Sequence, residues 1–133
     1  MVLIIGLPNA GKTTYSNQFD SVLHFDDIKH LPKKEQMKIY ATTTAECIEG
    51  IYNTKKSRKA VLSCTKAERN VCVWIDTPVD ICLQREQEYR RRPCDIVLSH
   101  ARGFEPPTYD EGWDEIIVIY GFQSDAHKKE ETQ

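Results

Sequence analysis

Residues 2–14 read VLIIGLPNAGKTT, and this stretch decides the fold. The apolar run at 2–5 predicts a buried strand, and GLPNAGKT at 6–13 is a complete G-x-x-x-x-G-K-T motif. Its glycines let a loop wrap a phosphate with backbone N–H groups, and a helix starting near Lys12 adds its positive end. The sequence therefore predicts a loop that binds a nucleoside triphosphate, against the alternative of a glycine-rich turn with an exposed lysine.

The motif also predicts roles for individual residues. Lys12 is expected to reach the β- and γ-phosphates, and the Thr13 hydroxyl is expected to bind Mg²⁺. The predicted cofactors are therefore ATP and Mg²⁺. The residues predicted to bind ATP are Gly6, Pro8, Asn9, Ala10, Gly11, Lys12, Thr13 and Thr14.

Composition limits the class of protein. A chain of 133 residues forms one domain, and a net charge of −2 does not by itself require a nucleic-acid partner. The cysteines are odd in number, at five, and form no C-x-x-C pair, which favours reduced thiols in a cytoplasm. We expect a cytoplasmic or virus-encoded protein. No apolar run is long enough for a membrane span, and no obligate protein partner is evident.

Apolar runs alternate with helical patterns along the chain. Strands are expected at 2–5, 21–25, 71–75 and 116–119, and helices at 12–19, after Pro32, after a Thr77 cap and from Pro93 to Gly103. This alternation predicts an α/β fold with a parallel sheet covered by helices on both faces. The domain should span residues 1–120, followed by a polar tail at 121–133.

The third strand has two candidate positions. A strand at 60–64 would leave only six residues before the strand at 71, too few for a parallel crossover. We therefore prefer a strand near 48–53 and a helix over about 55–69.

The carboxyl ends of the strands should hold the chemistry. Asp26 ends the second strand, so it is the candidate general base, with helix capping or a Mg²⁺–water contact as alternatives. The basic residues on the same rim are the candidate substrate contacts; Lys29, Lys33 and Lys55 are the main ones, with Lys34, Lys56, Arg58 and Lys59 beside them. A solvated helix start is the alternative for the group at 55–59.

Arginines follow the strand at 71–75. Arg85 and Arg90 lie on and just after the next helix, where they could neutralise charge on a transferring phosphoryl group. We expect the segment at about 79–103 to form a short helical lid carrying these two catalytic arginines. A solvated basic face is the alternative.

The segments GLPNAGKTTYS, HFDDIK, WIDTPVDICLQRE, RRRP and FEPPTYDEGWDEIIVI resemble, in that order, the polynucleotide-kinase-like branch of P-loop kinases. The resemblance implies a three-layer P-loop kinase fold with five strands in the order 2-3-1-4-5. It implies transfer of the γ-phosphate of ATP to the 5′-hydroxyl of DNA or RNA, with Asp26 as base, Lys29 on the substrate phosphate and a lid arginine near Arg85 or Arg90.

One departure from this family concerns the third strand. The family usually carries an acid at its end, whereas the expected strand here ends in Tyr52-Asn53-Thr54. The preferred prediction is a polynucleotide 5′-hydroxyl kinase with a nucleic-acid 5′ end as substrate. A kinase for small molecules or modified bases and a non-catalytic ATP-binding regulator remain the alternatives.

Overall fold

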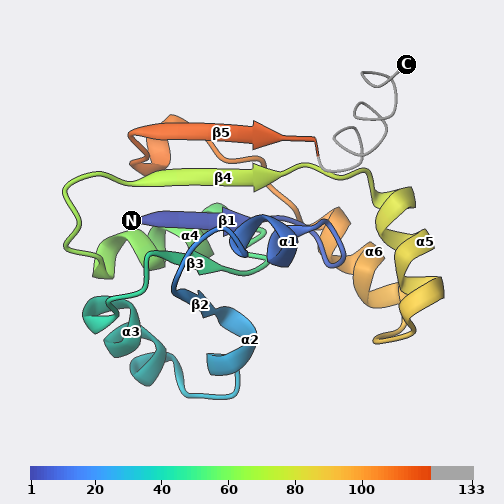
Figure 1. Ribbon diagram of the computed structural model, residues 1–133, viewed down its shortest axis with the longest axis horizontal. Helices are drawn as coiled ribbons and strands as arrows, with labels where there is room; N and C mark the ends of the chain where they lie inside the picture. The colour runs from blue at the N-terminus through green and yellow to red at the C-terminus, as the bar shows by residue number, and fades with distance from the viewer. Residues whose placement is uncertain (121–133) are drawn as a thin grey trace.

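Five parallel strands form a single sheet in the computed structural model, which describes residues 1–120 (Figure 1). The order is β2-β3-β1-β4-β5, as the resemblance implied. The predicted tail at 121–133 lies outside the described residues. The strands are β1 (Val2–Ile5), β2 (Val22–His24), β3 (Cys47–Glu49), β4 (Val71–Ile75) and β5 (Glu115–Ile119).

Helices connect the strands and, except for α2, run as the sequence predicts with shorter ends; α2 starts at Phe25, which the sequence analysis placed at the end of a strand. They are α1 (Lys12–Ser16), α2 (Phe25–Ile28), α3 (Lys33–Thr42), α4 (Lys55–Cys64), α5 (Val79–Tyr89) and α6 (Cys94–Arg102), with a 3₁₀ turn, η1, at Tyr109–Glu111. α5 and α6 occupy the segment predicted to form the lid and lie beyond the carboxyl ends of the strands (Figure 1). None of the helices within residues 1–120 is long and apolar enough to cross a membrane.

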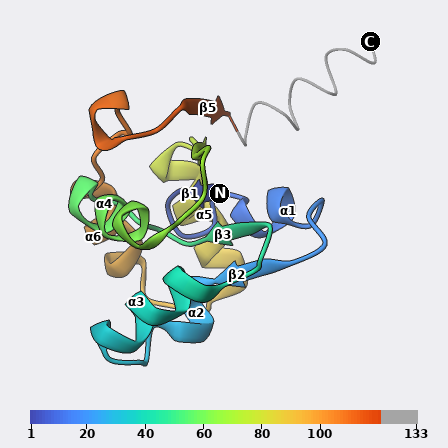
Figure 2. The same ribbon diagram turned by 90° about the vertical axis from the view of Figure 1, so that its left-hand side faces the viewer.

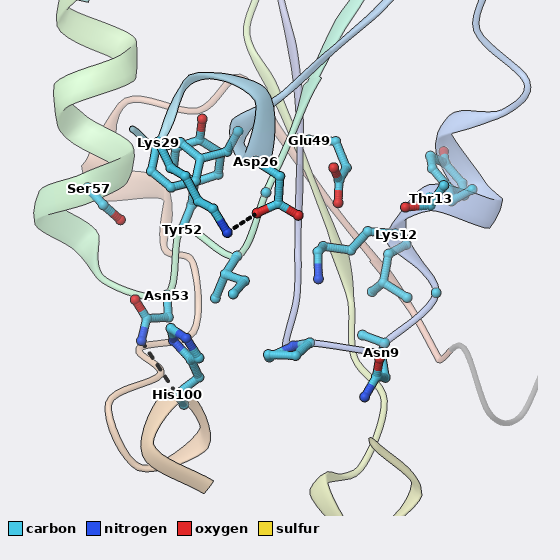
Figure 3. A pocket seen from close by; sticks show the side chains of 18 of the residues that line it. Asn9, Lys12, Thr13, Asp26, Lys29, Glu49, Tyr52, Asn53, Ser57 and His100 are labelled. Carbon is cyan, nitrogen blue, oxygen red and sulfur yellow. Dashed lines mark hydrogen bonds and ion pairs between the residues drawn. The ribbon is translucent and has the colours of Figure 1, made fainter. Parts of the chain in front are cut away.

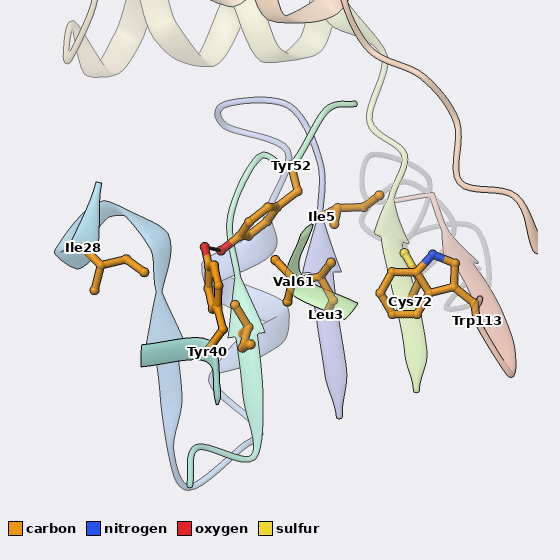
Figure 4. Close-up of a cluster of buried hydrophobic side chains, with 9 residues drawn as sticks. Leu3, Ile5, Ile28, Tyr40, Tyr52, Val61, Cys72 and Trp113 are labelled. Carbon is orange, nitrogen blue, oxygen red and sulfur yellow. Dashed lines mark hydrogen bonds between the residues drawn. The ribbon is translucent and has the colours of Figure 1, made fainter. Parts of the chain in front are cut away.

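The core has two halves because successive residues of a strand point to opposite faces. Leu3 and Ile5 pack with side chains of α3 and α4, including Tyr40 and Val61 (Figure 4). Ile4 packs on the other face with side chains of α1, α5 and α6. α4 and α1 accordingly lie on opposite sides of the sheet (Figure 2). This is the predicted three-layer arrangement.

The preferred position of the third strand is confirmed, and the alternative at 60–64 is wrong. Residues 60–64 belong to α4, which begins at a capping box: Thr54 Oγ1 accepts the Ser57 amide at 3.1 Å. The strand is shorter than expected and ends at Glu49 instead of Asn53. The chain then leaves the sheet at Tyr52. The φ of Tyr52 is 38°, in the left-handed region, and a residue with this conformation cannot continue a strand.

All five cysteines are free thiols. Cys47, Cys72 and Cys82 are buried, as expected for small core residues. Burial raises the pKa of the Cys72 thiol to about 12 and that of the Cys82 thiol to about 11. These buried thiols are therefore protonated at neutral pH.

Candidate functional site: a phosphate loop facing two carboxylates

The G-x-x-x-x-G-K-T loop joins β1 to α1 as predicted. Gly11 has a φ of 107°, which side chains rarely allow. At Gly6, an added Cβ would lie 2.9 Å from the carbonyl oxygen of Ile75. Gly6 therefore lies behind the loop against β4, and the other predicted ATP-binding residues line a cleft of about 1470 Å³: Pro8, Asn9, Ala10, Gly11, Lys12, Thr13 and Thr14.

Thr77 supports this loop from the segment that follows β4. The expectation that it caps the following helix was wrong, because its side chain makes no capping bond and α5 is preceded directly by Pro78. Its Oγ1 instead donates to the carbonyl oxygen of Ala10 at 2.7 Å. The hydroxyl therefore fixes the loop to the carboxyl end of β4.

Lys12 lies folded into its own loop. Its side chain is only 7% exposed, and Nζ donates to the carbonyl oxygen of Leu7 at 2.6 Å. Burial, with a smaller contribution from Arg92, lowers the pKa of Lys12 to about 8, although the Glu49 carboxylate opposes this change. The ammonium group therefore lacks a full charge partner in the free protein, and phosphate oxygens would supply one.

Glu49 is the site residue that the sequence analysis missed. The expectation that the third strand lacks an acid was wrong because β3 ends at Glu49, four residues before the position at which we expected its end. Glu49 is 8% exposed, and its Oε2 lies 2.9 Å from Nδ1 of His24 on the neighbouring strand. Its carboxylate faces the same opening as Lys12 (Figure 3).

Asp26 lies across the cleft from the loop (Figure 3). It lies within α2 and not at its cap, which is His24, so the helix-capping alternative does not hold. Its side chain is 79% exposed and forms an ion pair with Lys29 Nζ at 3.4 Å. The carboxylate of Asp26 is thus accessible from the cleft while it is paired with Lys29.

The candidate substrate lysines separate into two groups. Lys29 and Lys33 line the cleft, whereas Lys34, Lys55 and Lys56 do not. Lys55 instead acts on Asp110, whose pKa is held low mainly by a hydrogen bond from Thr108 and then by Lys55. The basic rim is therefore shorter than the sequence suggested.

Arg58 is not part of the basic rim. It is fully buried, and its guanidinium forms a paired contact with Glu111, with Nε–Oε1 at 2.7 Å and Nη2–Oε2 at 3.1 Å. It also donates to the carbonyl oxygens of Tyr52 and Glu105. Arg58 therefore fixes the segment after β3 and the loop before η1.

Arg85 and its neighbours approach the phosphate loop from α5. Nη1 of Arg85 donates to the carbonyl oxygen of Asn9 at 2.7 Å. Arg90 is exposed, has a left-handed φ of 54° and does not line the cleft, but Arg91 and Arg92 do. The left-handed turn at Arg90 sends the next two residues back toward the loop.

The side of the cleft opposite the loop is mostly neutral. It is lined by side chains of α3, of the segment after β3 and of α4: Gln36, Met37, Tyr40, Ile51, Tyr52, Asn53, Ser57 and Ala60. The hydroxyls of Tyr40 and Tyr52 lie 2.7 Å apart and satisfy each other. His100 of α6 closes this side (Figure 3), and burial together with the charges of Lys12 and Arg92 lowers its pKa, so that it is neutral at pH 7.

The oxygen donors in this cleft fit Mg²⁺. Thr13 presents a hydroxyl at the start of α1, and Glu49 presents a carboxylate from β3. Hydroxyl and carboxylate oxygens are the ligands that Mg²⁺ takes beside nucleotide phosphates.

Neither a protein-family model nor a curated protein sequence matches this chain. Among solved structures, an unliganded sugar kinase from Janibacter sp. HTCC2649 is similar with a TM-score of 0.65 and 14% identity, covering 98% of this chain and 90% of the other. A gluconokinase from Sinorhizobium meliloti 1021 has a TM-score of 0.60 and 9% identity, covering 99% and 96%. At such identities the likeness shows the fold alone. The chain therefore has an α/β P-loop kinase fold, and the narrower likeness to polynucleotide kinases is not supported by these neighbours.

Proposed function

We propose that this protein is an ATP-dependent kinase that phosphorylates a hydroxyl of a small molecule. The observation that carries the proposal is that Lys12, Glu49 and Asp26, from three different segments, face one cleft (Figure 3). A phosphate loop alone binds nucleotides, whereas a transferase also needs a base on the acceptor side.

In the proposed reaction the acceptor oxygen forms a bond to the γ-phosphorus, and the bond from that phosphorus to the β–γ bridging oxygen breaks. The acceptor proton passes to the carboxylate of Asp26, and ADP leaves. Lys12 and the loop amides hold the phosphates in line. Thr13 and Glu49 would hold Mg²⁺, directly or through water, and the bound ion would neutralise charge on the phosphates.

A small acceptor is favoured by the lining of the cleft. The polynucleotide prediction depended on basic residues after both β2 and β3, but of these residues only Lys29 and Lys33 line the cleft. The remaining acceptor side is formed by amide, hydroxyl and apolar groups, which suit a compact polyol better than a phosphate backbone. The two similar structures, named as a sugar kinase and a gluconokinase, agree with this choice.

Lys29 and Lys33 keep the polynucleotide 5′-hydroxyl as the second candidate acceptor. The non-catalytic alternative depended on a missing acid at the end of the third strand, and Glu49 removes that reason.

The test is transfer of labelled γ-phosphate from ATP to a panel of sugars, sugar acids and other polyols, beside 5′-hydroxyl DNA and RNA. We expect transfer to a small alcohol, about 10²–10⁴-fold less with Asp26→Asn, which is the usual effect of a lost acid–base group. Asp27→Asn is the matched control, because Asp27 is exposed and does not line the cleft. Transfer only to oligonucleotides, with a KM that rises steeply with salt, would instead support the second candidate.

A further inference from the structure

Asn9 connects the phosphate loop to helix α5. It has a left-handed φ of 67°, and its Nδ2 donates to the carbonyl oxygen of Cys82 at 3.2 Å and to Oε1 of Glu86 at 3.1 Å. The Asn9 carbonyl also accepts Nη1 of Arg85. Helix α5 therefore holds the loop at one residue, beside the opening that Lys12 faces (Figure 3).

The other carboxylate oxygen of Glu86 holds the segment that follows α5. Oε2 accepts the backbone amides of Arg91 at 2.6 Å and Arg92 at 3.0 Å, just after the left-handed turn at Arg90. Glu86 is 1% exposed. Burial favours a raised pKa for Glu86, but hydrogen bonds from Asn9 and from these two amides outweigh burial and lower it. The carboxylate is therefore ionised at neutral pH.

Both guanidinium groups lie over the loop as a result. Nη2 of Arg91 donates to Oδ1 of Asn9 at 2.7 Å, and Nη1 of Arg92 lies 3.5 Å from the same oxygen and 3.4 Å from Oε1 of Glu86. One buried carboxylate thus contacts the phosphate loop and sets the direction of two cations that line the cleft.

We propose that Glu86 is a positioning residue that holds Arg91 and Arg92 where they meet the terminal phosphate of a bound triphosphate. It touches no substrate itself and acts through the chain at 91–92 and through Asn9. Its effect on turnover rests on the proposed kinase function, whereas its effect on nucleotide binding does not. Since ATP carries one phosphate more than ADP, correctly placed guanidinium groups favour ATP over ADP.

The test uses Glu86→Gln, which keeps the shape but replaces one acceptor oxygen with an NH₂ group that cannot accept an amide N–H. We expect the preference for ATP over ADP, measured by calorimetry, to fall about tenfold, the effect of one charged hydrogen bond. With an acceptor, kcat should fall about 10–100-fold while the acceptor KM stays within about threefold. Glu88→Gln is the matched control, because Glu88 is exposed on the same helix, and it should change neither quantity.

A double-mutant comparison separates positioning from general support of the fold. In an Arg91→Ala/Arg92→Ala background, Glu86→Gln should cause no further loss of ATP preference; losses that multiply would overturn the proposal. If Glu86→Gln does not fold, Asn9→Gly removes the loop side of the contact while glycine tolerates the φ of 67°. It should reduce the ATP preference likewise.

Failure of the kinase function is a distinct result. A wild-type protein that binds ATP but phosphorylates no acceptor refutes the proposed function, and its ATP-to-ADP preference still tests Glu86. An unchanged preference in both the Glu86→Gln and Asn9→Gly variants refutes the role of Glu86 whether or not transfer occurs.

Discussion

Lys12→Met should stabilise the free protein at neutral pH and remove a specific pH dependence. The side chain of Lys12 is almost fully buried, and burial lowers its pKa from 10.5 to about 8. Between these two values the unfolded chain still holds a proton on Lys12 that the folded chain has lost. Because the unfolded state then binds more protons, the free energy of unfolding rises with pH across this window.

The magnitude follows from the same two pKa values. A difference of one pH unit in pKa corresponds to about 1.4 kcal/mol, so the charged lysine costs the fold about 3 kcal/mol below pH 8. Between pH 7 and pH 9.5, the titration of Lys12 should return about 2 kcal/mol of stability. Methionine has a similar length and no charge, so Lys12→Met should not show this gain.

Urea unfolding of the nucleotide-free proteins, at constant ionic strength from pH 7 to 9.5, measures the difference directly. The stability advantage of Lys12→Met should shrink by about 2 kcal/mol over this range. Two curves that stay parallel would refute the argument, because they would mean that the ammonium group is not desolvated in the free protein. The same reasoning predicts proton uptake when ATP binds at pH 8.5, since phosphates favour the charged lysine; calorimetry in two buffers detects this uptake.

Three further results are expected. Glu49→Gln should lower kcat and raise the Mg²⁺ concentration needed for half-maximal rate in a transfer assay; an unchanged Mg²⁺ requirement would exclude a metal-positioning role. Arg58→Ala should destabilise the fold by about 3–5 kcal/mol in urea unfolding because it leaves the carboxylate of Glu111 buried without its partner. A decrease of less than about 1 kcal/mol in the free energy of unfolding would contradict the burial of an unpaired Glu111 carboxylate. Lys33→Glu should raise the KM of an anionic acceptor, whereas Lys55→Glu, outside the cleft, should not; equal effects would point to general surface charge.

The phosphate loop could be predicted from sequence because its function depends on adjacent residues. In loops of this kind the backbone amides bind the phosphates, so two glycines and a lysine at fixed spacing are sufficient to identify the motif. The sheet order required more, and it came from the family resemblance together with the rule that a parallel crossover needs enough chain. That rule correctly excluded a strand at 60–64.

The end of β3 could not be predicted for a physical reason. A strand of three residues, Cys47–Glu49, is too short to show a periodic pattern, and a glutamate inside an apolar context reads as an interruption. Its burial becomes understandable only when His24 lies beside it on β2, 25 positions earlier in the chain. A charged residue directly before Gly50, inside the strand predicted near 48–53, was the one available signal.

The burial of the basic residues could not be predicted from the sequence either. Arg58 and Lys55 lie within one run of charged residues, yet one is fully buried on Glu111 and the other is partly exposed. Arg58 is buried because it pairs with Glu111, 53 residues further along the chain, and the local sequence does not reveal this partner. In the run after α5, a single left-handed residue, Arg90, decides which guanidinium groups turn toward the loop. The sequence predicted a basic lid but not which of its arginines turn toward the phosphate loop.

The two halves of the cleft are built from different kinds of segment. The groups expected to bind ATP come from one continuous loop. A loop of this kind can occur in two proteins that share the fold but are only 14% identical in sequence. The acceptor side is formed by α3, the segment after β3 and α4, which meet only in the folded chain. Under the proposed function, specificity there would depend on side chains that line the cleft, such as Asn53 and Lys33, so substitutions could change the acceptor without disturbing the phosphate loop. Variants on the acceptor side should therefore change the KM of the acceptor while leaving ATP affinity intact.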